Sequence, residues 1–316
     1  MTKIWRTIIL FFILWAGGSD SFCQTKTVHA FYFIYANNDT INAAKSDSVE
    51  ARKENCTRNL DLLRAKKTVS EIGEKFGYTV LHKVYSGELC SKECVYDCLE
   101  SLHCEDSDIV VFYYSGHGIS VMDKKDSLPV MTMKYHNNPM DIKKNAVPVN
   151  AIVNRLRLSG AHLNFVISDC CNDNCWAGNR NGVYIEDKSS NKNDHKNSHR
   201  LVVAITAANK GASTYYDIPS DEKYERINDS IMNDVKSDNY SRVGQYDDFT
   251  ASWFTYGLYK DMRYCLVLKE GDTWFSLNNL MNRIKKKLDQ FVDGYNYTKK
   301  VESFEKFKPS YRITFF

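Results

Sequence analysis

The sequence predicts an α/β protein in which a mostly parallel sheet is covered by helices on both faces. Apolar segments rich in β-branched and aromatic residues recur along the chain, as is typical of strands buried on both faces. Stretches with helical spacing separate most of these segments, as expected for parallel strands joined by crossover helices. The 316 residues, 43% of them hydrophobic, are enough for one large domain of this kind.

The first half of the chain alternates strands and helices. The opening apolar run ends at an Asn-Asn-Asp turn, and the charged and aliphatic stretch after it keeps helical spacing up to Gly77. A second helix precedes a strongly apolar strand that ends at a Gly-His-Gly turn. In order, we expect a strand at 28–35, a helix at 47–76, a strand at 78–84, a helix at 90–103 and a strand at 108–117.

The second half continues the alternation. An amphipathic helix ends at Gly160 and leads into a strand that ends at two adjacent cysteines. A further apolar strand, two helical stretches and a final strand complete the pattern. We expect these elements at 149–158, 163–171, 200–207, 249–262, 276–292 and 309–316. Two polar segments, 178–198 and 217–248, break the rhythm and are interpreted as exposed, mobile insertions.

The amino terminus has the features of an export signal. Two basic residues, Lys3 and Arg6, precede the apolar run 8–16, which is too short for a transmembrane helix of about 20 residues. We expect a signal peptide over 1–23 and a mature domain over 24–316, exported to the periplasm or the extracellular space. A short membrane anchor or a lipid-modified Cys23 are the alternatives.

The cysteine count fits an exported protein. Nine cysteines remain after residue 23, and an odd number leaves at least one thiol outside intrachain disulfides. Four disulfides and one free cysteine would satisfy this count. Cys90, Cys94 and Cys98 share one helical stripe that is too stretched to supply three ligands to one metal ion, so disulfides to other elements are expected there, with core packing as the alternative.

A histidine and a cysteine stand at the ends of two predicted strands, and they form the strongest chemical feature of the sequence. If these strands are parallel neighbours, His117 and Cys171 meet at the carboxyl edge of the sheet, where ligands bind in open α/β folds. The imidazole can take the thiol proton, and the thiolate can then attack a carbonyl. Backbone N–H groups of Gly118 and Cys171 could hold the resulting oxyanion.

The segments Tyr114-Ser-Gly-His-Gly118 and Asp169-Cys-Cys171 resemble the two catalytic motifs of the caspase-like cysteine peptidases, especially the metacaspases and their bacterial relatives. The resemblance implies the caspase-haemoglobinase fold, a three-layer α-β-α sandwich. Its six-stranded sheet has five parallel strands and a last antiparallel one. It also implies that His117 is the base and Cys171 the nucleophile. Cys170 is the rival nucleophile, although the spacing of the motif favours Cys171.

The same resemblance implies which substrate residues the peptidase prefers. The acid two residues before the nucleophile lines a pocket for a basic side chain in metacaspases, which implies that Asp169 favours Arg or Lys before the scissile bond. Asp39, after the first strand, could supply a second carboxylate, or it could be an ordinary turn residue. Caspase-like enzymes are often processed after the nucleophile strand, so self-cleavage in 178–198 is also implied.

These observations predict an exported cysteine endopeptidase that acts on protein or peptide substrates. The alternative is a catalytically silent caspase-like domain that serves as a binding or scaffold module. The net charge is +3 with interspersed signs, so nucleic acid is not an expected partner. We expect no metal, no required cofactor and no stable membrane insertion after signal cleavage.

Overall fold

The computed structural model describes residues 25–36, 49–120, 128–133, 144–172, 201–208, 214, 216–267, 286 and 312–315. Its centre is a six-stranded sheet of order β2-β1-β3-β7-β8-β9, in which the first five strands are parallel and β9 is antiparallel to β8. The predicted mostly parallel six-stranded sheet is therefore confirmed. The strands are β1 (Thr27–Ile34), β2 (Thr79–Ser86), β3 (Ile109–Ser115), β7 (Leu163–Asp169), β8 (Leu201–Thr206) and β9 (Arg312–Phe315).

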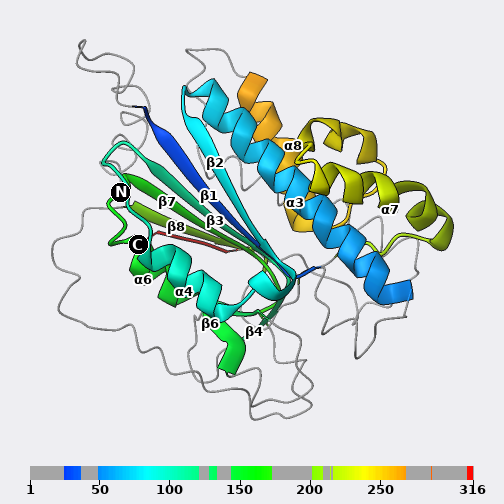
Figure 1. Ribbon diagram of the computed structural model, residues 1–316, viewed down its shortest axis with the longest axis horizontal. Coiled ribbons are helices and arrows are strands. Elements are labelled where there is room, and N and C mark those ends of the chain that lie inside the picture. The colour runs from blue at the N-terminus through cyan, green and yellow to red at the C-terminus, as the bar shows by residue number, and fades with distance from the viewer. Residues whose placement is uncertain are drawn as a thin grey trace.

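Helices cover both faces of this sheet (Figure 1). On one face, α3 lies against β1 and β3, α7 packs on α3, and α8 packs beside α3 with its first turn in contact with β3 and β7. On the other face, α4 and α6 enclose an apolar core with Phe33, Phe112 and Val166 of the sheet. The five helices are α3 (Val49–Lys75), α4 (Lys92–Glu100), α6 (Val149–Leu156), α7 (Asp221–Lys236) and α8 (Trp253–Val267).

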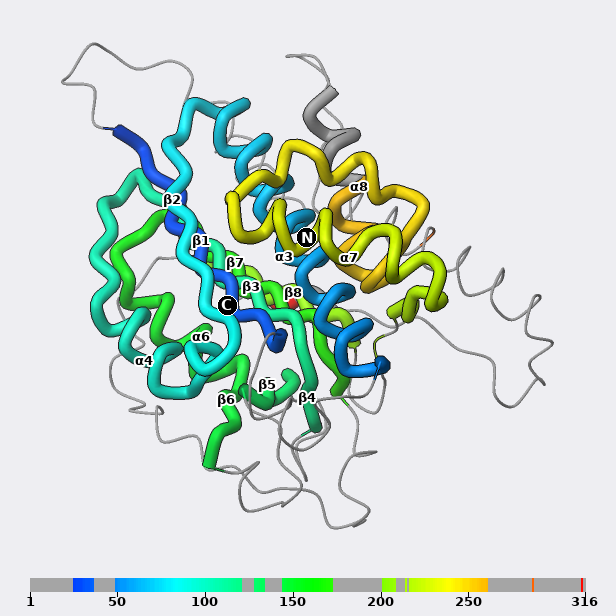
Figure 2. The backbone as a smooth tube through the Cα atoms, turned by 45° about the vertical axis from the view of Figure 1, so that its right-hand side comes forward, coloured from blue at the N-terminus to red at the C-terminus, as the bar shows by residue number. Residues whose placement is uncertain are grey.

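A small antiparallel sheet lies beyond the carboxyl end of β3, and the sequence pattern did not predict it. It has the order β4-β5-β6, with β4 (His117–Ile119), β5 (Val130–Thr132) and β6 (Ala146–Pro148). Figure 2 shows the three short strands together below the main sheet. The expected single strand over 108–117 is thus divided at Gly116, so His117 begins a new strand in a second sheet.

The segment 217–248 was expected to be an exposed, mobile insertion, and this expectation is wrong. It contains α7 and the 3₁₀ helix η5 (Tyr240–Tyr246). Ser220 caps α7 by accepting a hydrogen bond from the Lys223 N–H, and Asp221 and Glu222 favour its first turn. The sequence is polar on average, but its few apolar residues recur at helical spacing and are buried: Tyr224, Ile227, Ile231, Val243 and Tyr246.

The expectation of four disulfides is also wrong for the described residues, because none of the cysteines there forms one. Cys98 of α4 is a buried thiol whose pKa burial raises to about 12. With Cys90, it packs in the apolar core between the sheet and α4. The stripe Cys90, Cys94 and Cys98 is therefore explained by packing, in which cysteine acts as a small apolar residue.

Several expectations fall outside the described residues. These are the signal peptide over 1–23, the turn residue Asp39, the segment 178–198 and, except for residue 286, the helix over 276–292. In the part of the chain that is described, no helix is long and apolar enough to cross a membrane.

Candidate active site

The register between β3 and β7 brings the two predicted catalytic residues to the same edge of the sheet. Ser115 at the end of β3 pairs with Asp169 at the end of β7, and the Gly116 N–H donates to the Asp169 carbonyl oxygen at 3.1 Å. His117 and Cys171 each follow two residues later, at the carboxyl edge of the sheet. The predicted meeting of these two residues at one sheet edge follows directly from this pairing.

Gly118 lies directly against the cysteine segment. A Cβ atom at this position would collide with the Cys171 carbonyl oxygen and with the Sγ of Cys170. Only glycine lets the backbone of β4 approach the end of β7 this closely. The role of Gly118 and Cys171 as oxyanion donors stays a prediction, but the two backbones are in contact, as that role requires.

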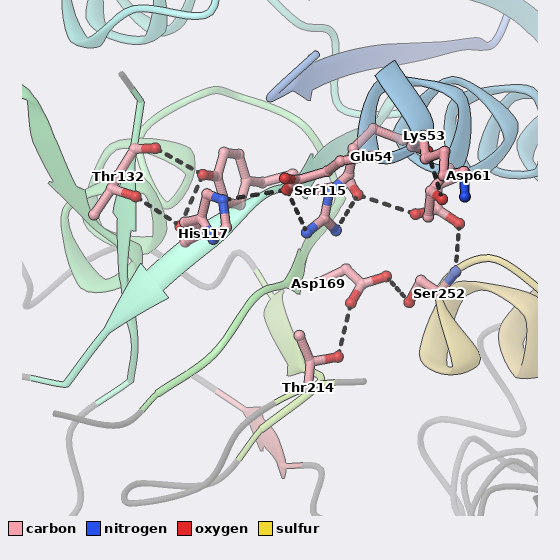
Figure 3. Close-up of polar contacts among 12 residues, drawn as sticks. Lys53, Glu54, Asp61, Ser115, His117, Thr132, Asp169, Thr214 and Ser252 are labelled. Atoms are coloured by element: carbon pink, nitrogen blue, oxygen red, sulfur yellow. Dashed lines mark hydrogen bonds and ion pairs between the residues drawn. The ribbon is translucent and has the colours of Figure 1, made fainter. Parts of the chain in front are cut away.

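His117 is held from several sides. Its carbonyl oxygen accepts hydrogen bonds from the Tyr114 hydroxyl at 2.8 Å and the Thr132 hydroxyl at 3.1 Å, which fix its backbone. The Tyr35 ring meets the imidazole edge-on, with 5.0 Å between ring centroids. On the opposite side, Glu54 Oε1 of α3 lies 3.2 Å from His117 Nε2 (Figure 3). The imidazole is therefore oriented by an aromatic ring and a carboxylate.

The two adjacent cysteines have different surroundings. Cys170 is fully buried in the apolar core on the α4 side, and its Sγ lies 3.0 Å from the Ser168 hydroxyl. Burial raises the pKa of the Cys170 thiol, which keeps it protonated and unreactive. Cys171 is half-buried. Side chains alternate along a strand, so Cys171 and Asp169 share the side opposite to Cys170.

Tyr216 links Cys171 electrostatically to α3. Burial raises the pKa of the Tyr216 hydroxyl, and negative charge on Glu54 and on Cys171 raises it further. The guanidinium of Arg58 lies 4.7 Å from the centre of the Tyr216 ring. The Tyr216 hydroxyl therefore senses the charge of both Cys171 and the α3 residues Glu54 and Arg58, so these groups belong to one electrostatic environment.

Asp169 is buried and held by three hydroxyl groups. Its Oδ1 accepts a hydrogen bond from Thr214 at 3.1 Å, and its Oδ2 accepts one from Thr255 at 2.6 Å and another from Ser252 (Figure 3). Ser252 and Thr255 lie at the start of α8, so this helix fixes the carboxylate. The assignment of Asp169 to a substrate pocket stays a prediction.

A second buried carboxylate, Asp61 of α3, lies close to Asp169. Its oxygens accept hydrogen bonds from the Ser252 N–H at 3.1 Å and the Ser115 hydroxyl at 3.2 Å. Burial and then the negative charge of Asp169 raise the pKa of Asp61 to about 7, against the positive charges of Arg58 and Arg64. Burial therefore outweighs the two neighbouring cations and favours the protonated form of Asp61.

Sequence reasoning found His117, Cys171, Gly118 and Asp169 but missed the side chains that α3 and α8 contribute. Glu54, Arg58 and Asp61 recur at intervals of four and three residues, so they share one face of α3. The available signal for their role in the site was that three charged residues share one face of a helix that covers the sheet. They looked like solvent-facing residues because no apolar stripe marked which face of this helix was buried.

The chain is similar to known proteins in structure and in sequence family. Among solved structures, a protein from Geobacter sulfurreducens is similar at 12% sequence identity and a TM-score of 0.44, over 92% of each chain. Caspase-1 from Spodoptera frugiperda is similar at 12% identity and a TM-score of 0.45, over 92% of this chain and 88% of that one. No curated protein sequence matches the chain. The family model of the caspase domain matches residues 61–308, and the chain therefore belongs to the caspase domain family of cysteine peptidases.

Proposed function

We propose that this protein is an exported cysteine endopeptidase that cleaves after Arg or Lys, with Cys171 as nucleophile and His117 as base. The observation that supports it best is the strand register, in which Ser115 pairs with Asp169 and the two reactive side chains follow at equivalent positions. Glu54, 3.2 Å from His117 Nε2, adds a carboxylate that favours the protonated imidazole.

In the proposed reaction, His117 accepts the proton of the Cys171 thiol, and the thiolate attacks the peptide carbonyl carbon. Backbone N–H groups of Gly118 and Cys171 stabilise the oxyanion. The imidazolium then gives its proton to the leaving amine as the C–N bond breaks, and a thioester remains on Cys171. Water, deprotonated by His117, attacks the thioester, and its hydrolysis releases the carboxylic acid and regenerates the thiol.

The proposed preference for a basic residue before the scissile bond rests on charge. Asp169 and Asp61 are both buried and both accept hydrogen bonds from Ser252, so two carboxyl groups lie close together at this end of the sheet. A Lys or Arg side chain of the substrate would supply further positive charge. An acidic side chain in the same place would be repelled by both carboxylates.

The test is hydrolysis of a peptide panel that differs only at the residue before the cut, with Arg, Lys, Gln and Asp. We expect Arg and Lys to exceed Gln by about 10- to 100-fold in kcat/KM, the range of a charge-assisted hydrogen bond of about 1.5–3 kcal/mol. Asp169→Asn should reduce this ratio, whereas Asp234→Asn, in a buried position of α7, should leave it unchanged. Preferred cleavage after Asp or Gln would contradict the specificity, and hydrolysis that persists in both Cys171→Ala and His117→Ala would contradict the mechanism.

We include self-processing in the proposal. The segment 178–198 and its border hold five residues that such an enzyme would cut after: Arg180, Lys188, Lys192, Lys196 and Arg200. The competing region 217–248 is disfavoured, because Lys223 and Arg226 lie in α7 and both pair with Asp248.

Mass spectrometry of wild-type and Cys171→Ala protein tests self-processing, because only the wild type should be cut. Intact, active wild-type protein would contradict obligatory processing, and identical fragments from both would assign the cut to another protease.

Export is the remaining part of the proposal, supported by the basic start and the apolar run 8–16. Amino-terminal sequencing of the protein recovered from the exported fraction should give a chain that begins after residue 23. A full-length chain retained in the cytosol would contradict export.

A further inference from the structure

The described residues contain a second group of reactive side chains, at the end of the sheet opposite to the catalytic pair. It consists of His29 near the start of β1, Cys104 in the loop after α4, and Asp108 just before β3. The His29 imidazole nitrogen, the Cys104 sulfur and an Asp108 carboxylate oxygen all lie within 4.8 Å of one another. The seven residues of β3, at about 3.3 Å each, put roughly 20 Å between this group and His117.

We propose that His29, Cys104 and Asp108 bind a divalent transition metal ion, with Zn²⁺ as the best match. Imidazole, thiolate and carboxylate are the side chains that bind zinc, at about 2.0–2.3 Å. Two such ligands of one tetrahedral ion lie roughly 3–4 Å apart. His29 Nε2 and Asp108 Oδ2 already lie 3.2 Å apart, so only the Cys104 sulfur has to move inward.

The surroundings of Asp108 resemble those of a ligand that is oriented before metal binds. Its Oδ1 accepts a hydrogen bond from the Thr27 N–H, and its Oδ2 accepts one from the Glu105 N–H, both at 3.0 Å. The second lone-pair position of Oδ2 faces His29 Nε2, and a metal ion would take the place of the proton between these two atoms. Hydrogen bonds of this kind to a ligating carboxylate are typical of metal sites.

The charge of the group also favours a cation. Asp108 is buried, and its ion-pair partner is His29, whose side chain is 20% exposed. The negative charge of Asp108 contributes, after burial, to raising the pKa of Tyr78 to about 12. Zinc would replace the His29 proton and the Cys104 proton, and the exposed side of His29 leaves a fourth position for water.

Bound metal would join two segments that are distant in sequence. His29 belongs to β1, and Cys104 and Asp108 belong to the connection between α4 and β3. An ion held by all three fastens the amino-terminal edge of the central sheet, and binding to the folded chain alone raises the unfolding temperature by mass action. This role is independent of the catalytic pair and of the proposed peptidase activity.

The test uses reduced, metal-free protein in a Cys171→Ala background, because the catalytic Cys171 and His117 could themselves bind metal. Titration with Co²⁺ should produce a thiolate-to-cobalt charge-transfer band and d–d bands of a tetrahedral site, and Zn²⁺ should displace it. Cys104→Ser should abolish the charge-transfer band, and His29→Gln should weaken cobalt affinity more than about 100-fold, beyond the 10- to 100-fold typical of outer-shell partners.

Two matched controls keep the result specific. Cys94→Ser replaces a half-buried thiol of α4, and His103→Gln replaces an exposed imidazole next to Cys104. Both should bind Co²⁺ as the parent does, and Zn²⁺ should raise the unfolding temperature of both but not that of His29→Gln. Unchanged cobalt spectra in Cys104→Ser and His29→Gln, or equal losses in the controls, would overturn the proposal.

Discussion

Glu54 Oε1 lies 3.2 Å from His117 Nε2, and this contact brings a helix on one face of the sheet to the predicted catalytic base. Glu54 also lies 3.7 Å from a guanidinium nitrogen of Arg58, which is itself buried in the same helix. The carboxylate is thus placed between a fixed cation and the imidazole. It can hold the ring in one orientation and stabilise its protonated form, as the third member of a nucleophile–base arrangement does.

The first prediction follows from this contact. Glu54→Gln keeps the shape of the side chain but removes the charge that stabilises the imidazolium. We expect kcat to fall about 10-fold with little change in KM, since a charge interaction that shifts one pKa by a unit is worth about 1.4 kcal/mol. The pH profile of kcat should shift toward lower pH, because a nearby negative charge favours proton binding by both the thiol and the imidazole, and Glu54→Gln removes that charge. Steady-state kinetics across pH measures both effects.

Glu50→Gln is the matched control, since it removes an exposed carboxylate from the first turn of the same helix. It should change neither kcat nor its pH profile. Partial recovery in Glu54→Asp would support a positioning role. An unchanged pH profile in Glu54→Gln would show that the ion pair is structural only.

The second prediction separates the two cysteines. Cys170 is buried in the core and its thiol pKa is raised, whereas Cys171 is half-buried at the sheet edge. An alkylating, arginine-directed probe should label the wild type and Cys170→Ser but not Cys171→Ala. Cys170→Ser should instead lose stability, because it places a hydroxyl in an apolar core. Labelling that persists in Cys171→Ala and disappears in Cys170→Ser would reverse the assignment.

The sequence predicted the parts of the site that depend on strand order. Apolar runs identified β3 and β7, and their ends placed His117 and Cys171 together because parallel neighbours end at one edge. It could not predict β4, β5 and β6, since strands of three residues are too short for a periodic pattern. It also missed Asp61 and Arg64, because charged residues are rarely fully buried. The partners that make their burial tolerable, Ser252 and the carbonyl oxygens of Thr250 and Phe249, lie almost 200 residues away.

The third prediction concerns pH and stability. The pKa of Asp61 is about 7 in the folded chain and near 3.8 in the unfolded chain. Between these values the folded state keeps a proton that the unfolded state releases, so the free energy of unfolding falls as pH rises from about 4 to about 7. The Asn side chain in Asp61→Asn cannot ionise. We therefore expect the free energy of unfolding to fall less in this variant than in wild type between pH 5 and pH 8.

Urea unfolding of wild type and Asp61→Asn at pH 5 and pH 8 gives the change in unfolding free energy of each protein. The difference between the two changes isolates Asp61, because the other titrating groups contribute equally to both proteins. Asp234→Asn serves as the control, because Asp234 is also buried but interacts with Tyr246 and Arg242 and not with the hydrogen-bond partners of Asp61. The idea fails if wild type and Asp61→Asn show the same change in unfolding free energy between pH 5 and pH 8.

The fourth prediction tests whether α7 belongs to the folded core. Ile231 is fully buried against α3 and η5, whereas Ile218, just before the helix, is 52% exposed. Ile231→Ala should lower the free energy of unfolding by about 2–5 kcal/mol through lost burial and a cavity, and Ile218→Ala by less than about 0.5 kcal/mol. Trypsin should cut wild type slowly after Lys223, Arg226 and Lys236, and faster in Ile231→Ala. Rapid cleavage of wild type at these bonds, with equal stability of the two variants, would show that α7 is not packed on α3.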